Sequence, residues 1–368
     1  MALSRRAFLV TAAAASLPLS PSLATDTGRA GWYMSGGADA GMTHHAAVID
    51  DAGRTRLAHE LPARGHAAAV SPDGRTAVLC ARRAGQFVTV IDLLTLSAVH
   101  EIAAQPDRHF HGHACFSVDG AVLFTTENAF DSGDGRIGVY DAVNGYRRLG
   151  EWRSHGIGPH ELALHPDGRT LVVANGGILT HPDSGREALN LDTMAPNLGL
   201  IDSQTGDLAH RIEMPQSLSL LSSRHLSVSR EGTVAVVMQY QGDESETPPL
   251  IALVNDRHGL EFLNAPAPVQ TAMANYCGSV AFDRVGGCFG VSSPRGNLFT
   301  FWQIDGRFRT SVSITDGCGI APGGAAGTFV LSSGTGGLWR FDLETGHLQP
   351  LAGPIAPIAH WDNHLTAL

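Results

Sequence analysis

The hexapeptide Arg-His-Phe-His-Gly-His, residues 108–113, places three histidines within five positions of the chain. Imidazole nitrogens are common ligands of zinc, copper and iron, so this spacing could form a metal site. Histidine also serves as an ordinary hydrogen-bonding residue, because its two ring nitrogens can donate and accept at the same time. A metal site here needs ligands from elsewhere in the chain, which directs attention to the other histidines.

The last histidine of the hexapeptide begins a segment that recurs along the chain. His113-ACFSVDGAVLFTTE is similar to His66-AAAVSPDGRTAVLCA and to His160-ELALHPDGRTLVVAN. Further copies, two of them degenerate and the last one truncated, begin at His225, Cys277, Cys318 and His364. The seven starts lie 47, 47, 65, 52, 41 and 46 residues apart, which indicates a repeat architecture.

Each complete copy has the pattern of a β-hairpin, with two alternating apolar strands around a tight turn. A third strand that ends in aspartate follows, as in residues 88–92, 137–141, 198–202 and 338–342. A fourth strand comes next, as in residues 98–102. Four short strands in a unit of about 40–50 residues are typical of a β-propeller blade, and helical periodicity is nearly absent.

The truncated copy at His364 predicts how the ring closes. It supplies one strand, and residues 31–62 could supply the other three strands of the same blade. We therefore predict one all-β domain over residues 25–368, a seven-bladed β-propeller closed by pairing of the N- and C-terminal strands in one blade. Six or eight blades are alternatives, because the copies at Cys277 and Cys318 are weak.

The first strand of each propeller blade lines the central axis, so residues that begin these strands should meet there. The predicted ring consists of His66, His113, His160, His225, Cys277, Cys318 and His364. Imidazoles and thiolates at short range could bind iron, copper or zinc at the mouth of the channel. Alternatively, each histidine forms hydrogen bonds between strands, and the two cysteines are buried or bonded to each other.

Loops that join the second and third strands open on the same face as this ring. The longest, residues 175–197, is either functional or a lid that packs on the rim. Glu127 and Glu161 are the carboxylates best placed to join a histidine ligand or to act as a general base. Arg82, Arg83 and Arg295 could bind an anionic ligand. The predicted ligand-binding face consists of Arg82, Arg83, Glu127, Asn128, Glu161, Asn175, His181, Gln239 and Arg295.

Composition argues against several classes of function. The chain has 35 acidic and 25 basic residues, a net charge of −10, and every basic residue is arginine. The acidic balance argues against nucleic-acid binding, and the lack of lysine excludes Schiff-base chemistry and a P-loop. The five cysteines form no C-x-x-C pair, and their odd number leaves at least one thiol unpaired within a monomer. No hydrolase, zinc-protease or nucleotide-binding motif occurs.

Residues 1–24 have the features of a Tat-type signal peptide. Arg5 and Arg6 precede a short alanine-rich apolar run, and residues 22–24 offer small side chains at the cleavage positions. Prolines interrupt this run, which makes a membrane anchor the weaker interpretation. We expect a periplasmic protein, exported by the Tat pathway, without a membrane span in the mature chain.

Several motifs resemble those of a known bacterial family. They are GIGPHELAL from Gly156, the loop motif T-H-P-x-S-G-R-E-x-L-N-L-D-T-M over residues 180–194, R-H-L at 224–226 and Q-Y-Q-G at 239–242. The chain resembles domain-of-unknown-function family 1513 over nearly its whole mature length. These are Tat-exported, WD- and YVTN-like propeller proteins that are often encoded beside imelysin-type iron-uptake proteins. The resemblance implies periplasmic metal handling with such partners, but it supplies no catalytic residues.

Three hypotheses about function follow. In the first, the ring and the two carboxylates bind a transition metal, with iron favoured, and the protein acts with uptake partners. In the second, the same face carries a lactonase-like hydrolase or a metal-dependent oxidoreductase, for which Glu127, Asn128, Asn175 and His160 are candidates. In the third, the propeller is a scaffold that binds another protein across its rim, since fold alone does not determine function.

Overall fold

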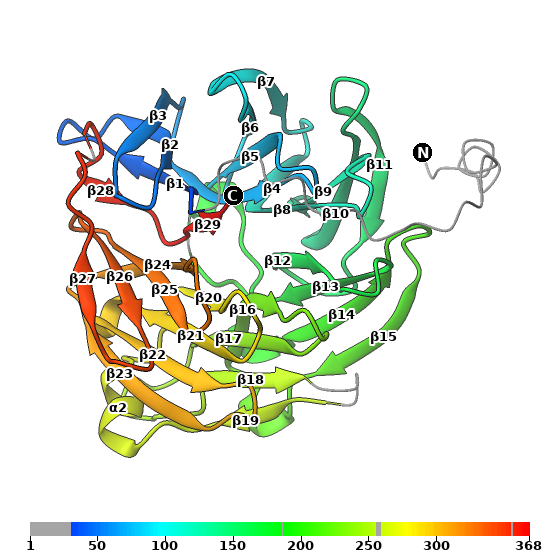
Figure 1. The fold of residues 1–368 in the computed structure, drawn as a ribbon. Helices are drawn as coiled ribbons and strands as arrows, with labels where there is room; N and C mark the ends of the chain where they lie inside the picture. The colour runs from blue at the N-terminus through cyan, green and yellow to red at the C-terminus, as the bar shows by residue number, and fades with distance from the viewer. Residues whose placement is uncertain (1–30, 186, 255–258, 355) are drawn as a thin grey trace.

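The computed structural model describes residues 31–185, 187–254, 259–354 and 356–368. The predicted signal peptide, residues 1–24, lies outside these ranges. Seven antiparallel sheets of the described chain are arranged in a ring, as Figure 1 shows, which confirms the predicted seven-bladed β-propeller. The degenerate copies at Cys277 and Cys318 each form a complete blade.

Three complete blades follow one another from the start of the repeat. The first contains β4 (Gly65–Val70), β5 (Thr76–Ala81), β6 (Phe87–Asp92) and β7 (Ser97–Ala103). The second contains β8 (Arg108–Phe116), β9 (Val122–Ala129), β10 (Asp134–Asp141) and β11 (Arg147–Arg153). The third contains β12 (Pro159–Leu164), β13 (Thr170–Asn175), β14 (Asn197–Asp202) and β15 (Leu208–Glu213).

Three further complete blades continue the ring. The fourth contains β16 (Leu221–Val228), β17 (Val234–Tyr240), β18 (Ile251–Val254) and β19 (Glu261–Leu263). The fifth contains β20 (Ser279–Phe282), β21 (Cys288–Ser293), β22 (Leu298–Gln303) and β23 (Phe308–Ser313). The sixth contains β24 (Gly317–Pro322), β25 (Thr328–Ser333), β26 (Leu338–Asp342) and β27 (Leu348–Pro350).

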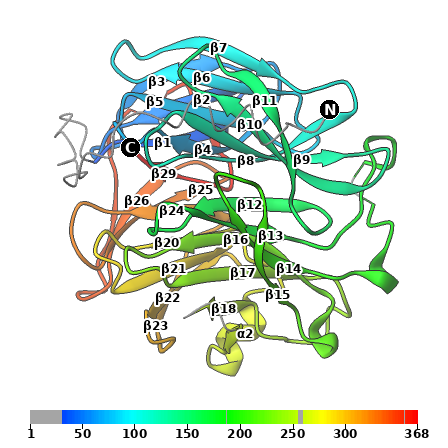
Figure 2. The ribbon, with the colours of Figure 1, turned by 90° about the vertical axis from the view of Figure 1, so that its right-hand side faces the viewer.

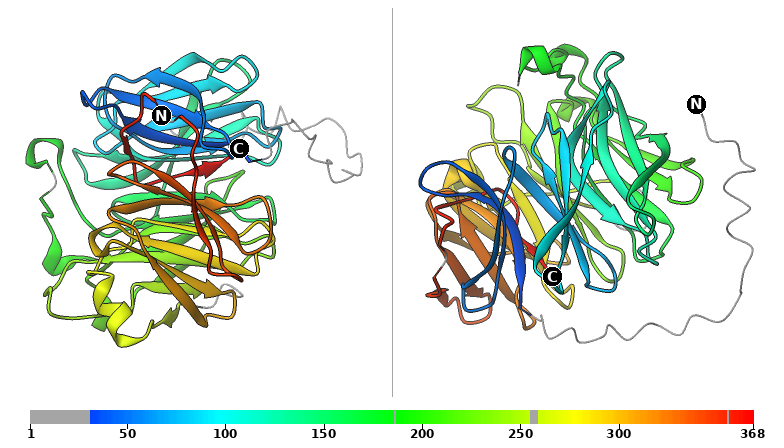
Figure 3. Two further views of the ribbon diagram at one scale, coloured as in Figure 1. Left: turned by 60° about the vertical axis from the view of Figure 1, so that its left-hand side comes forward. Right: turned by 90° about the horizontal axis from the view of Figure 1, so that it is seen from above.

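The seventh blade joins the two ends of the described chain. Strands β1 (Tyr33–Ala38), β2 (His44–Ile49) and β3 (Thr55–Glu60) come from the N-terminal side. The short strands β28 (His360–Trp361) and β29 (Thr366–Ala367) both pair with β1 from its inner side. In Figure 3 the red C-terminal segment accordingly lies beside the blue N-terminal strands. The predicted closure of the ring is confirmed.

The hairpin turns explain why Asp-Gly recurs in the sequence. Between β4 and β5, the Asp73 carboxylate accepts hydrogen bonds from the Ser71 hydroxyl and the Arg75 backbone amide. Gly74 adopts a positive φ of 66°, which glycine tolerates better than other residues. The aspartate that ends each predicted third strand also caps a turn, since Asp92 accepts from the amides of Leu94 and Thr95.

The apolar core lies between neighbouring blades. One cluster joins Val78 and Val88 of the first blade to Phe110, Leu123 and Tyr140 of the second. Each sheet thus buries both faces, while its outermost strand remains largely exposed, as in β7 and β15. Figure 2 shows these blades from the side.

Few helical turns interrupt the strands. Four 3-10 turns and one short helix are present in the described residues: η1 (Pro182–Ser184), η2 (Leu191–Thr193), η3 (Gln216–Leu218), η4 (Pro294–Gly296) and α2 (Ala267–Ala272). Turns η1 and η2 lie in the long loop between β13 and β14. No helix in the described part of the chain is long and apolar enough to cross a membrane.

Candidate functional site

The five histidines of the predicted ring meet on the axis of the propeller. Four lie within inner strands and His364 lies just before β29, and their sequence separations reach nearly 300 residues. Ring-centroid distances range from 4.5 Å, for His160 with His225, to 6.3 Å, for His66 with His225. Four of the five are buried, and His160 is half-buried. The cluster is formed by His66, His113, His160, His225 and His364.

A β-bulge directs most of these histidines toward the axis. The register of the inner strand shifts at Gly65/Ala68, Phe110/Ala114, Pro159/Glu161 and Ser223/His225, and each shift contains or adjoins a channel histidine. An extra residue in one strand bends it and changes the direction of the nearby side chains. Gly112 leaves room for the His66 ring, because a Cβ added at Gly112 would lie 2.5 Å from Cδ2 of His66.

Carboxylates and one hydroxyl contact the Nδ1 atoms of four channel histidines. Glu161 lies between two of them, with Oε2 3.0 Å from His225 Nδ1 and Oε1 3.5 Å from His113 Nδ1. On the other side, Asp362 Oδ1 lies 3.0 Å from His66 Nδ1. The Ser279 hydroxyl lies 3.3 Å from His364 Nδ1. This is the outer-shell arrangement that orients imidazoles in metal sites.

Burial keeps four of the channel imidazoles neutral at neutral pH. It lowers the pKa of His66, His160 and His364 well below the usual range, and nearby histidines add to the effect. Burial also lowers the pKa of His225 to about 4, although its hydrogen bond with Glu161 opposes this shift. For Glu161, burial is outweighed by attraction to His113 and by hydrogen bonds with His113 and His225, so its pKa is well below the usual range.

These protonation states assign the tautomers. Because the Glu161 carboxylate can only accept, Nδ1 of His225 must donate to it, and Nε2 then carries the lone pair. Buried ring nitrogens without a hydrogen-bond partner among the described residues include His113 Nε2, His364 Nε2 and His160 Nδ1. Unpartnered buried acceptors are costly, and a bound cation would satisfy them.

The ligand atoms form two overlapping groups of metal-binding size. His66, His113 and His364 offer nitrogens that all lie within 4.8 Å of one another. His113, His160 and His225 form a second group with the same property. His113 belongs to both groups, so it is the central residue of the cluster.

The two cysteines of the predicted ring lie apart from these groups. Cys277 is packed in an apolar cluster of the fourth and fifth blades, with Sγ 3.8 Å from the Leu250 carbonyl oxygen. Cys318 donates to the Asp362 carbonyl oxygen at 3.1 Å. All five cysteines are free thiols, so the alternative of a Cys277–Cys318 disulfide is wrong. Neither cysteine belongs to a group of metal-binding size among the described residues, so their predicted role as metal ligands stays a prediction.

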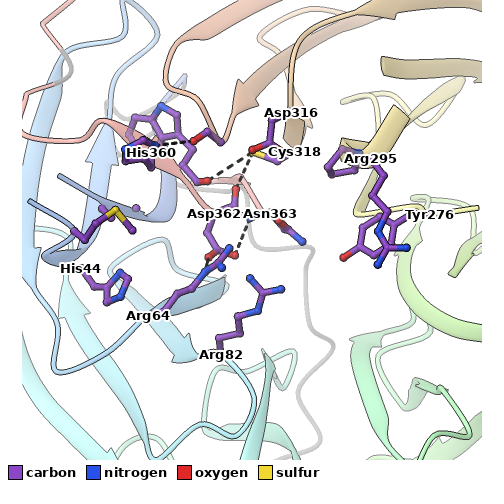
Figure 4. A pocket seen from close by; sticks show the side chains of 16 residues that line it. His44, Arg64, Arg82, Tyr276, Arg295, Asp316, Cys318, His360, Asp362 and Asn363 are labelled. Carbon is purple, nitrogen blue, oxygen red and sulfur yellow. Dashed lines mark hydrogen bonds and ion pairs between the residues drawn. The ribbon is translucent and has the colours of Figure 1, made fainter. Parts of the chain in front are cut away.

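Two adjoining cavities open at the mouth of the channel. One, of about 240 Å³, is lined by His66, His160 and His225 together with arginines and neutral polar residues. The other, of about 520 Å³, is lined by residues that include Arg64, Asp316 and Asp362. Figure 4 shows this second cavity, with Arg64 beside Asp362 and Arg295 over the ring of Tyr276. Four residues line both cavities: Arg82, Tyr276, Arg295 and Asn363.

The model of the family described as "Protein of unknown function (DUF1513)" matches residues 59–368. The chain belongs to this family. The match includes all seven predicted ring positions, from His66 to His364. No curated protein matches the chain.

Four residues of the predicted ligand-binding face line the cavities of this family member, and Glu161 contacts the histidine cluster itself. The four are Arg82, Arg83, Gln239 and Arg295. The Gln239 side-chain amide donates to the Cys277 carbonyl oxygen at 3.0 Å. The prediction that second-to-third-strand loops contribute to the channel face thus applies to the first, fourth and fifth blades.

The other four predicted face residues are not among those that line either cavity. Glu127 is bound within its own blade by Tyr140 and Arg148, at 2.7 and 2.8 Å. Asn175 donates to the Ser154 carbonyl oxygen at 2.9 Å and to Asn197 at 3.0 Å. Asn128 is buried in β9. His181 accepts from the Asp183 amide at 3.2 Å in the long loop, which packs on the rim at Phe130.

Sequence reasoning missed the residues one or two positions before the ring. Arg224 and Asn363, which precede His225 and His364 directly, line the cavity of about 240 Å³. Asp362 and His111 lie two positions before their ring histidines. Asp362 forms a hydrogen bond with His66, and His111 lines the same cavity of about 240 Å³. The repeat alignment places these residues beside the ring, but it does not show which of them face the channel, since His111 and Arg224 lie within bulges.

The hexapeptide of residues 108–113 divides between these roles. His113 belongs to the histidine cluster, while His111 lines the neighbouring cavity with both ring nitrogens buried and unpartnered. His109 stacks on His111 at 5.1 Å and on Phe130 at 6.2 Å, away from the axis. The three histidines are therefore not a local metal motif.

Proposed function

We propose that this protein binds a divalent transition-metal ion among the five channel histidines. The observation that carries this proposal is the set of buried, unpartnered ring nitrogens, in a cluster whose other nitrogens contact Glu161, Asp362 and Ser279. Neutral imidazoles bind a cation without first losing a proton. The two carboxylates beside the rings offset the charge of a dication.

The donor set favours particular metals. Imidazole nitrogens suit zinc, copper, nickel and iron, whereas oxygen-rich sites suit magnesium and calcium. Affinity for such a site rises toward copper in the usual order of divalent ions. The preference for iron rests on the family resemblance rather than on the ligands, so iron(II), copper(II) and zinc(II) are separate arms of the test.

Retention of metal by the purified protein tests this proposal directly. Purified protein is stripped on a chelating resin, incubated with each ion alone, desalted and analysed for bound metal. The wild type should retain about one ion per chain. His113→Ala should bind at least about tenfold more weakly, because His113 belongs to both groups of ligands. His347→Ala, on the exposed surface, should bind as the wild type does.

Two results would contradict the proposal. The first is wild-type protein that retains none of the three ions, which would favour a scaffold for protein binding. The second is stoichiometric metal that survives both His113→Ala and His160→Ala. Circular dichroism of each variant separates loss of ligands from loss of the fold.

We also propose that the protein is exported to the periplasm and acts there with metal-uptake partners of imelysin type. The features of residues 1–24 and the family resemblance support this part. Cell fractionation tests the export. The uptake role predicts that loss of the protein lowers the cellular iron content, and that wild-type protein restores it whereas His113→Ala does not.

A further inference from the structure

The mouth of the channel concentrates positive charge in an acidic protein. The chain carries a net charge of −10, yet four arginines line the cavity of about 240 Å³: Arg82, Arg83, Arg224 and Arg295. They come from three separate places, the end of β5, the bulge of β16 and turn η4. No aspartate or glutamate is among the described residues that line this cavity.

Arg224 is the most informative of the four. Its side chain is only 9% exposed, and its Nε has no hydrogen-bond partner in the described structure. A buried guanidinium nitrogen without a hydrogen bond is costly, because water no longer solvates it. A positive side chain kept in this position needs a negative group nearby.

The remaining walls of the cavity fit an anion. Gln239, Tyr240, Gln241, Tyr276 and Asn363 contribute neutral polar groups and aromatic surface. Tyr276 stacks beneath the Arg295 guanidinium, 4.5 Å from it, and so limits its orientations. The volume lies below the range of about 300–1,000 Å³ that is common for drug-sized ligands, which favours a small molecule.

We propose that this cavity is a binding site for a small oxyanion, a molecule that bears carboxylate or phosphate groups, recognised by Arg224 with Arg82, Arg83 and Arg295. Guanidinium groups bind both kinds of oxyanion through paired hydrogen bonds. The site goes beyond the metal proposal, because the arginines bind the anion whether or not the histidines hold a metal.

The position of the site has a consequence for metal binding. His66, His160 and His225 line the same cavity, so a bound anion lies next to the proposed metal. Attraction between the two charges makes each ligand raise the affinity for the other, and the two effects must be equal.

Calorimetric titration of metal-free protein tests the site. Protein stripped on a chelating resin, in buffer free of phosphate and carboxylates, is titrated with citrate in one arm and with inorganic phosphate in the other; glycerol is the uncharged control. At least one anion should bind with one site per chain, more weakly as sodium chloride is added. The arm that binds more tightly identifies the source of the oxyanion.

Two variants connect the binding to the arginines. Arg224→Gln should weaken it at least about tenfold, since hydrogen bonds between charged groups are lost. Arg295 is exposed, so Arg295→Gln gives the same test without disturbing a buried side chain. Arg169→Gln is the matched control, because Arg169 pairs with Asp202 on the outer surface.

The outcomes separate this site from the metal site. Anion binding by a chain that retains no metal would leave this inference standing and contradict the metal proposal alone. Absence of binding by both anions, or unchanged binding in both Arg224→Gln and Arg295→Gln, would overturn the inference. Metal retention by such a protein would leave the histidine site intact.

Discussion

At the scale of single residues, the chemistry of the channel depends on which side-chain atoms face one another. Burial keeps His66, His160, His225 and His364 neutral, and the Nδ1 atoms of four of the five histidines contact Glu161, Asp362 or Ser279. Glu161 is the only acidic residue among the positions directly after the seven ring residues, and it contacts two imidazoles. Its role is to orient them, since a metal in the cluster would be bound by ring nitrogens.

Replacement of Glu161 by glutamine should therefore weaken metal binding without removing a ligand. The amide has no charge and keeps only one acceptor oxygen, so one of His113 and His225 faces an N–H group and loses its fixed orientation. Changes to such outer-shell partners typically cost 10–100-fold in metal affinity. Titration of stripped protein with zinc(II) measures the loss. Glu231→Gln, on the exposed surface, should leave the affinity unchanged, and an equal affinity in Glu161→Gln would contradict this role.

The cysteines should be unreactive in the folded protein. Burial raises the pKa of the Cys115, Cys277 and Cys318 thiols to about 12, and no disulfide links any of the five. The thiolate is the reactive form, so at about pH 8 a thiol reagent should detect few groups in native protein and five after denaturation. Rapid reaction of the native protein, or fewer than five thiols in the denatured protein, would contradict this prediction.

At the scale of strands and loops, the sequence predicts more of the fold than of the site. The Asp-Gly turns, the aspartates that end third strands and the apolar alternation are local signals, and together they predicted seven blades, although the copies at Cys277 and Cys318 were too weak to exclude six or eight. The repeat register also identified which histidines meet on the axis. The role of Arg224 depends instead on the bulge within β16, and that of Asp362 on the segment between β28 and β29 that closes the ring. Neither a bulge nor the path of such a segment has a sequence signature comparable to a turn, so these roles could not be predicted.

The blade formed by β8–β11 shows a second limit of sequence reasoning. Glu127 was expected on the channel face, but it is 1% exposed and accepts two hydrogen bonds from the Arg148 guanidinium, each 2.8 Å long. Thr125 and Tyr140 also donate to it. Gly138 on the facing strand leaves room for the carboxylate, because a Cβ there would lie 1.9 Å from Glu127 Oε1. Glu127 thus joins strands of one blade.

Glu127→Gln should consequently affect stability rather than ligand binding. Loss of Glu127 leaves Arg148, whose side chain is 17% exposed, with only the more exposed Glu151 as its counter-charge. Removal of one member of such a pair costs about 3 kcal/mol of unfolding free energy. Chemical denaturation followed by circular dichroism measures this change, while metal and anion affinities of the folded variant should equal those of the wild type. A variant with normal stability and impaired ligand binding would restore Glu127 to the channel face.

At the scale of the whole molecule, the channel exists only because the ring is closed. The closing blade takes β1 to β3 from one end of the chain and β28 and β29 from the other. Two backbone hydrogen bonds cross the closure. The Leu368 amide donates to the Trp32 carbonyl oxygen at 2.9 Å, and the Asp362 amide donates to the Gly36 carbonyl oxygen at 2.9 Å. The same C-terminal segment carries His364 and Asp362, so closure and assembly of the histidine cluster are one event.

Deletion of residues 358–368 should therefore abolish cooperative folding as well as metal binding. The deletion removes Ile358, Trp361 and Leu365, all at most 5% exposed, and burial of each such side chain contributes about 1.5–3 kcal/mol. Their sum is comparable to the whole stability of a typical domain. Thermal melting checks this, and excess synthetic peptide 358–368 should raise the melting temperature by mass action, whereas a scrambled peptide should not. His364→Ala keeps the closing strands, so it should melt cooperatively and lose only metal affinity. A truncated chain that melts like the wild type would show that the other six blades are stable without closure.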